Sequence, residues 1–235
     1  HKLSKRNGDA SFQDLVAKGY LPAAILNYIA LLGWSPETEQ EIYSLDELKK
    51  AFSVERISKS PAIFDIEKLT WMNGMYIRNL TLEQFHQLAL PHLQNAVKGD
   101  FDLVDISKIL QPRVSTLNEI DEMVDFFDAL PEYDIAMYTH KKMKTNAEIA
   151  LASLKQAREV LAALPQWSEE AIHDSLMNLI QELGIKNGQM LWPVRTAVSG
   201  KQFTPGGAIE IAHILGQAET LRRIDTGIAK LSEQA

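Results

Sequence analysis

Apolar residues recur along most of this chain every three or four positions, which is the spacing of one face of an α-helix. Residues 21–33, 147–161 and 168–183 show this pattern most clearly. The strict alternation of apolar and polar residues that marks a half-buried strand is nearly absent. The pattern therefore predicts a mainly α fold, with at most a short extended piece near the start.

Residues that favour helix ends stand at the edges of several of these segments. Ser44 and Thr81 are each followed three positions later by Glu or Gln, which is the capping-box pattern. Asp65 and Ser168 are suited to cap two further helices, and Gly184 is suited to end the second of them. These residues predict where helices begin and end.

Three other boundaries follow from turn-forming residues. Asn73 and Gly74 predict a break in the helix that Asp65 opens. Thr204 and Pro205 predict a cap and a first-turn proline for a helix that ends near residue 215. Residues 115–127 keep the helical period and predict one continuous helical segment.

Charge argues mildly against a role with nucleic acids. The chain has 24 basic and 31 acidic residues and a net charge of −7, whereas a nucleic-acid binder usually carries a positive surface. A local basic face can still bind phosphate. Basic residues do cluster at the N-terminus, at residues 140–144 and at Arg222 with Arg223, although each cluster taken alone indicates a solvated surface.

Composition also limits metal sites and location. The chain has no cysteine, and its six histidines show no ligand spacing, so we expect no structural metal. It has no run of eighteen apolar residues and no signal-peptide pattern near its start. We therefore expect no membrane association and a cytoplasmic location.

The first eight residues have an unusual composition. Lys2, Ser4, Lys5 and Arg6 combine positive charge with a hydroxyl group and are followed by Gly8. Ammonium groups, hydroxyls and exposed backbone amides are suited to hold a polyphosphate. The alternative for this segment alone is a frayed basic tail.

Taken with the motifs that follow it, this segment resembles a known family. Residues 2–6 (KLSKR) resemble the KMSKS loop of class I aminoacyl-tRNA synthetases, in the form seen in bacterial glutamyl-tRNA synthetases. In family order there follow, among others, GYLP at 19–22, WMNG at 71–74, QPRV at 111–114, WPVR at 192–195 and TPG at 204–206. The resemblance spans the chain and is weakest between about residues 85 and 165.

The resemblance implies a C-terminal portion of the enzyme that begins at the KMSKS-type loop. It implies a tRNA stem-contact domain at residues 1–80, followed by an all-helical anticodon-binding domain with subdomains at 81–160 and 161–235. Nothing in the chain resembles the HIGH motif of the catalytic domain. The parent protein is then expected to be a glutamate-tRNA ligase, while this portion, lacking the N-terminal catalytic domain, is expected to be inactive alone.

The resemblance also implies roles for the first loop. Lys5 corresponds to the lysine that stabilises the triphosphate of ATP during activation of the amino acid, and Lys2 and Ser4 correspond to supporting ATP contacts. ATP and Mg²⁺ are the expected cofactors of the full enzyme, and none is expected to be bound to this portion.

At the other end of the chain, the resemblance implies contacts with the anticodon. Arg195, Thr204 and Pro205 match positions that contact anticodon bases in the family, and arginine has the planar donors that base edges require. Arg113 matches less firmly an arginine that reads the third anticodon base. Of the four tryptophans, Trp34 and Trp71 are expected in a core or domain interface.

The expected partner is tRNA(Glu), and two alternatives stay open. The enzyme could be of the non-discriminating type, which also charges tRNA(Gln) with glutamate. From a different class, the chain could be a helical protein-interaction scaffold without an RNA role, which the net charge of −7 would suit. A test of tRNA binding at low salt distinguishes the synthetase hypothesis from the scaffold hypothesis.

Overall fold

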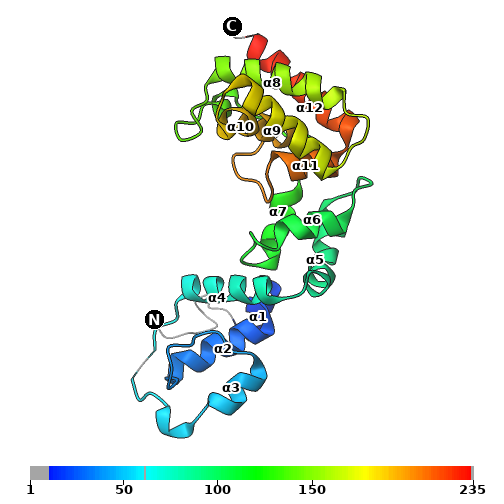
Figure 1. Cartoon of the computed structure of the whole chain (residues 1–235). Helices are drawn as coiled ribbons and strands as arrows, with labels where there is room; N and C mark the ends of the chain where they lie inside the picture. Colours follow the sequence, from blue (N-terminus) through cyan, green and yellow to red (C-terminus); the bar gives the residue numbers. More distant parts are fainter. Residues whose placement is uncertain (1–10, 61, 234–235) are drawn as a thin grey trace. The chain divides into compact units, whose positions relative to one another are not determined.

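The computed structural model describes residues 11–60 and 62–233, and within these ranges the chain is built from helices and turns (Figure 1). Two isolated β-bridges are the only extended pairings among the described residues. The predicted mainly α fold is confirmed. The chain divides into two compact units, one with residues up to 93 and 110–121, the other with 94–109 and 122 onward. The functional boundaries near residues 80 and 160 remain predictions.

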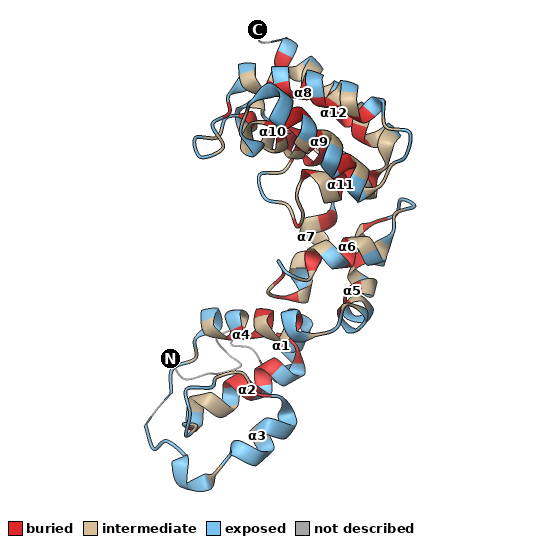
Figure 2. Cartoon of the chain, viewed as in Figure 1, coloured by how far each residue is buried: buried red, intermediate tan, exposed pale blue. Residues whose placement is uncertain are grey.

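The first unit is built around two packed helices. Its N-terminal helices are α1 (Phe12–Ala17), α2 (Pro22–Gly33), α3 (Leu45–Ala51) and α4 (Ile66–Asn79). Helices α2 and α4 contact each other, and their buried faces form the core with α1. The core residues include Leu15, Ile25, Tyr28, Leu69 and Met72. Helix α3 has no buried residue, and all of its residues except Leu48 are exposed (Figure 2).

Local capping signals are confirmed in this unit. The Ser44 capping box forms in full, and Thr81 and Gln84 bond each other's backbone amides at 3.2 and 2.9 Å. Asp65 caps α4 by accepting hydrogen bonds from two backbone amides. Each of these contacts satisfies a backbone donor that the first helical turn leaves without a partner.

The break predicted at Asn73 is wrong, because α4 continues through it. The Asn73 side chain is fully buried and bonds other segments of the chain. Its carbonyl oxygen accepts from the amide of Leu21 at 2.7 Å, and its Nδ2 donates to the carbonyl of Ser115 at 2.6 Å. A residue that favours turns in isolation is here a buried polar bridge.

The expected core position of tryptophan is confirmed for Trp34. Trp34 is 3% exposed and packs against Tyr43 and Phe52. Trp71 is 45% exposed on α4, so it does not lie in the core of this unit, and its place in a domain interface stays a prediction. The helical period places Leu69 and Met72 inward, which turns Trp71 to the outer face of the helix.

Two helices connect the two units along the chain. Helix α5 (Leu82–Ala96) leads out of the first unit, and α6 (Leu103–Leu110) leads back to it. The single helical segment predicted at 115–127 is instead a 3₁₀ turn at Leu117–Glu119 followed by the short helix α7 (Ile120–Val124). Phe126 and Phe127 follow α7 as buried, stacked rings, so the apolar period continues into a turn rather than a helix.

The second unit contains a bundle of five helices. They are α8 (Ala147–Ala162), α9 (Glu169–Leu183), α10 (Asn187–Ser199), α11 (Ala208–Leu215) and α12 (Gln217–Ser232). Helix α8 contacts α9, α10 and α12, and its buried face is part of the bundle core (Figures 1 and 2). Ser168 caps α9, and Gly184 ends it with φ +63°, as predicted.

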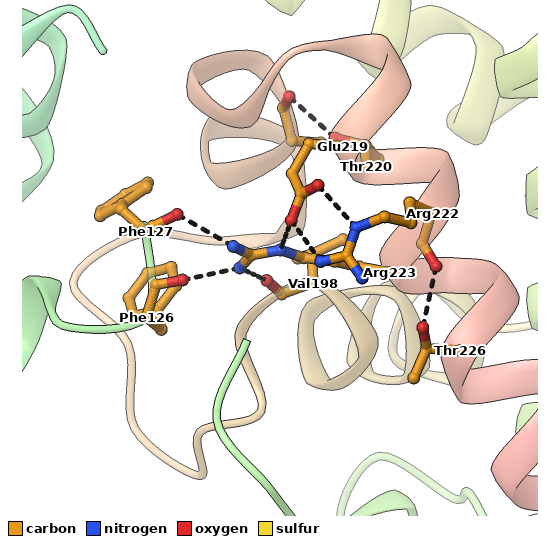
Figure 3. A network of polar contacts seen from close by, with 9 residues as sticks. Phe126, Phe127, Val198, Glu219, Thr220, Arg222, Arg223 and Thr226 are labelled. Carbon is orange, nitrogen blue, oxygen red and sulfur yellow. Dashed lines mark hydrogen bonds and ion pairs between the residues drawn. The ribbon is translucent and has the colours of Figure 1, made fainter. Parts of the chain in front are cut away.

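A fully buried arginine ties α12 to two other segments of this unit. The Arg223 guanidinium donates to the carbonyl oxygens of Phe126 and Val198, each at 2.7 Å, and of Phe127 at 2.9 Å (Figure 3). Its charge is compensated by Glu219 at 2.6 Å. The predicted solvated surface at Arg222 and Arg223 is therefore wrong for Arg223, since only Arg222 is exposed.

This network predicts a loss of stability in acid. Arg222, by hydrogen bonding, and then Arg223 lower the pKa of Glu219 from 4.5 to about 2. A carboxylate whose pKa is lower in the folded than in the unfolded protein stabilises the fold above the unfolded pKa, and that contribution is lost as pH falls. We expect the free energy of unfolding to fall between pH 4.5 and 2, measured by urea denaturation at each pH. Glu219→Gln should show a shallower fall, and an unchanged slope would contradict the assignment.

Candidate nucleic-acid interface

The structure describes the residues predicted to contact RNA but not those predicted to contact ATP. Lys2, Ser4 and Lys5 lie outside the described residues. Arg113 lies in the first unit, and Arg195, Thr204 and Pro205 lie together in the second. Only the last group can be built into a site from the structure.

Helix α10 presents an aromatic and a cationic side chain one turn apart. Trp192 is held by a hydrogen bond from its indole Nε1 to the carbonyl of Met137 at 2.8 Å. The ring of His140 packs on it at 4.1 Å between centroids, and the Arg195 guanidinium carbon lies 4.4 Å from the Trp192 centroid. Positions three apart share a helix face, so the helix itself brings Trp192 and Arg195 together. A cation over an indole face is an attractive arrangement.

Arg195 also holds the loop between α10 and α11. One of its terminal nitrogens donates to the Thr204 hydroxyl at 2.9 Å, and the other donates to the carbonyl of Gln202 at 2.8 Å. The Thr204 hydroxyl in turn donates to the carbonyl of Gly206 at 2.6 Å. The structure therefore brings together two of the predicted RNA-contacting residues, Arg195 and Thr204.

The predicted helix start at Thr204 and Pro205 is wrong. Helix α11 begins at Ala208, and Gly207 is its N-cap in an extended conformation. The Thr204 hydroxyl is engaged by Arg195 and Gly206, so it does not cap a helix. Pro205 is buried within the loop.

A hollow of about 380 Å³ lies beside Arg195. It lies between α10, the start of α11 and the segment at residue 143. Its walls are mostly apolar, with Arg195 and Asn187 as polar members; the other lining residues are Met143, Gly188, Leu191, Trp192, Gly207 and Ala208. A concave apolar surface with a few directed polar groups is typical of a site for a small planar group such as a nucleobase.

Basic residues flank Met143, a lining residue of the hollow, in the sequence. Lys141 and Lys142 are exposed on the turn at 140–145, as predicted for that cluster. Met143, between them and Lys144, packs closely on Gly188 of α10. The neighbouring ammonium of Lys144 lowers the pKa of Lys186, which precedes α10. Positive charge is thus concentrated near this end of α10 although the whole chain is acidic, a distribution that suits phosphate.

Arg113 stands in a different setting. It follows α6 in a turn, and its backbone amide donates to the carbonyl of Leu110 at 2.8 Å. Its side chain is exposed and makes no hydrogen bond or ion pair with any residue that the structure describes. The Arg113 side chain therefore contributes no hydrogen bond to the described part of this unit, and its role with RNA stays a prediction.

Sequence reasoning missed Gln202 and Phe203 in the loop. Gln202 takes part through its backbone carbonyl, which any residue offers, so no sequence signal could identify it. Phe203 is 83% exposed, and its aromatic type next to the TPG motif was the available signal.

Within residues 11–60 and 62–233, no three His, Asp or Glu side chains are grouped so that they could hold a metal ion. No described helix is long and apolar enough to cross a membrane.

Comparison with known proteins gives two matching family models. Residues 84–228 match the model of the anticodon binding domain, and residues 1–71 match that of the catalytic domain of class I tRNA synthetases (E and Q). A glutamate-tRNA ligase of Clostridium tetani is 60% identical over 99% of this chain and 48% of that protein. One of Clostridium acetobutylicum is 57% identical, with the same shares.

Solved structures give the same relationship. A glutamate tRNA ligase from Elizabethkingia meningosepticum, crystallised with its amino acid, has a TM-score of 0.78 and 27% identity, covering 97% of this chain and 45% of that one. The chain spans about half the length of the relatives it matches. The resemblance to glutamyl-tRNA synthetases predicted from the motifs is confirmed, and by its match over residues 84–228 the chain belongs to the anticodon binding domain family.

Proposed function

We propose that this chain is the tRNA-binding portion of a glutamate-tRNA ligase, and that it docks the inner side of tRNA(Glu) and its anticodon loop. The observation that carries the proposal is the Arg195 site, where a guanidinium, an indole and an apolar hollow lie together within the matched anticodon binding domain. These groups offer stacking surface and planar hydrogen-bond donors, which are what unpaired bases require.

The activity of the whole enzyme is part of this proposal. The enzyme attaches glutamate to tRNA(Glu) and uses ATP with Mg²⁺, as class I synthetases do. Lys2, Ser4 and Lys5 are proposed to contact the triphosphate, with Lys5 in the catalytic role. The pocket for glutamate is proposed to belong to the catalytic domain, whose model matches this chain at residues 1–71. Charging of tRNA(Gln) by the same enzyme is a second possibility that substrate competition would decide.

This chain is expected to bind tRNA(Glu) without catalysing the activation of glutamate. The purified chain should bind tRNA(Glu) most tightly at low salt, because neutralising phosphates releases counterions. It should show no glutamate-dependent exchange of pyrophosphate into ATP. Filter binding at two salt concentrations, with an unrelated RNA hairpin of equal length as control, measures the first property.

Two outcomes would contradict the proposal. Equal affinity for tRNA(Glu) and the unrelated hairpin would leave only non-specific attraction to phosphate. No binding to either RNA at low salt, together with capture of a protein partner, would favour the helical scaffold. Exchange activity above a protein-free control would contradict the assignment of catalysis to a separate domain.

A further inference from the structure

Phe203 is the most exposed large apolar side chain among the described residues, at 83%. Single exposed apolar residues are common on protein surfaces, so exposure alone means little. The exposure of Phe203 is informative because both of its neighbours in the chain are bonded to Arg195. Phe203 lies between Gln202 and Thr204, the two residues of the loop that Arg195 bonds.

The loop that carries Phe203 is fixed at several points. Arg195 bonds the residues on both sides of Phe203, and Thr204 bonds Gly206 within the loop. At the other end, the Lys201 ammonium lies 2.7 Å from the Asp125 carboxylate. Hydrogen bonds on both sides of Phe203 therefore restrain the backbone, and its ring is exposed.

The same arginine lines the apolar hollow beside α10. Arg195 therefore bonds the loop that carries the exposed Phe203 ring. It also lines a hollow that includes the Trp192 indole. An aromatic ring that is held in solvent before binding loses little conformational freedom when a partner covers it. The partner that fits a flat aromatic face beside a guanidinium is an unpaired nucleobase.

We propose that Phe203 is a stacking platform for an unpaired base of the RNA loop that this domain binds. The inference rests on the proposed function and extends it, since the resemblance pointed to Arg195, Thr204 and Pro205 but not to Phe203. Stacking on a phenyl ring is tolerant of base identity, so Phe203 supplies affinity and Arg195 supplies selectivity.

Substitutions at position 203 separate stacking from simple apolar contact. We expect Phe203→Ala and Phe203→Leu to weaken binding of the anticodon stem-loop RNA of tRNA(Glu) by about 5- to 100-fold. Phe203→Tyr keeps the aromatic face and should bind within about twofold of the wild type. Leu183→Ala is the matched control, because Leu183 is a 43% exposed apolar residue of the same unit.

Fluorescence of the RNA gives a second readout that a merely structural role would not move. A 2-aminopurine placed in the anticodon loop is quenched when an aromatic ring stacks on it. We expect the wild type and Phe203→Tyr to quench it at one loop position, and Phe203→Ala to leave it bright at saturating protein. Thermal unfolding of each variant establishes that it is folded.

The outcomes distinguish this inference from the function on which it rests. If the wild type binds the stem-loop and Phe203→Ala binds equally well, or if Phe203→Leu binds as tightly as Phe203→Tyr, stacking by Phe203 is overturned and the proposed function stands. If the wild type does not bind the stem-loop or tRNA(Glu) at low salt, both are overturned.

Discussion

Replacement of Arg223 with alanine is expected to lower the free energy of unfolding of the second unit by about 3–5 kcal/mol. The guanidinium is fully buried and donates to three backbone carbonyls, those of Phe126, Phe127 and Val198. Its removal leaves these acceptors without a donor, and it leaves Glu219 with only one of its two cationic partners. Each buried polar group that loses its partner costs its desolvation penalty.

The neighbouring residue provides a matched control. Arg222 bonds the same carboxylate at 2.7 Å, but its side chain is 58% exposed. Arg222→Ala should therefore cost less than about 1 kcal/mol. Arg223→Lys keeps a charge and loses the planar donors that reach two segments at once, so we expect it to be destabilising as well.

Urea denaturation followed by circular dichroism measures the differences. The two units can unfold in separate transitions, so the transition of the second unit should move and that of the first should stay in place. If Arg222→Ala and Arg223→Ala lowered the free energy of unfolding equally, the buried Arg223 would stabilise the unit no more than a surface ion pair does.

Most helices of the second unit, and several boundaries of the first, could be predicted from sequence because their causes are local. A capping hydroxyl and the residue it serves are three positions apart, as at Ser44 and Ser168. Asn73 shows the limit of this reasoning. Its side chain bonds Leu21 and the carbonyl of Ser115, which lie 52 and 42 residues away. No local pattern contains such partners, so its turn propensity predicted a break that the fold does not have.

Only part of the candidate site could be predicted from the sequence, because only part of it depends on local spacing. The shared face of Trp192 and Arg195 follows from their spacing on one helix. The bonds from Arg195 to Thr204 and Gln202 cross an irregular loop whose path the sequence does not determine. Thr204 and Pro205 are typical of a helix start, and this local pattern gave a wrong prediction. In the structure the Thr204 hydroxyl bonds Gly206 within the loop, and α11 begins at Ala208.

Replacement of Arg195 with alanine is expected to weaken binding of tRNA(Glu) by about 1–3 kcal/mol, the usual range for a bidentate contact with a base. Lys142→Ala is the control for charge, because Lys142 is an exposed lysine of the same unit. A phosphate contact should weaken all RNAs alike and reduce the salt dependence. Binding of both variants to tRNA(Glu) and to the same tRNA with an altered anticodon, at two salt concentrations, separates the two effects.

The structure adds a second route by which Arg195 can act, because it also holds the loop at Gln202 and Thr204. Thr204→Val removes the bond to Arg195 and the bond from Thr204 to Gly206, and it leaves the guanidinium in place, so it disturbs the loop without removing Arg195. If Arg195 contacts a base, Arg195→Ala should lose discrimination between the two anticodons, and Thr204→Val should lose less. If Arg195 only positions the loop, its effect should disappear in the background of Phe203→Ala, since the ring that the loop presents is already gone. Equal weakening of both tRNAs by Arg195→Ala would reduce it to a phosphate contact, and unchanged binding would remove it from the site.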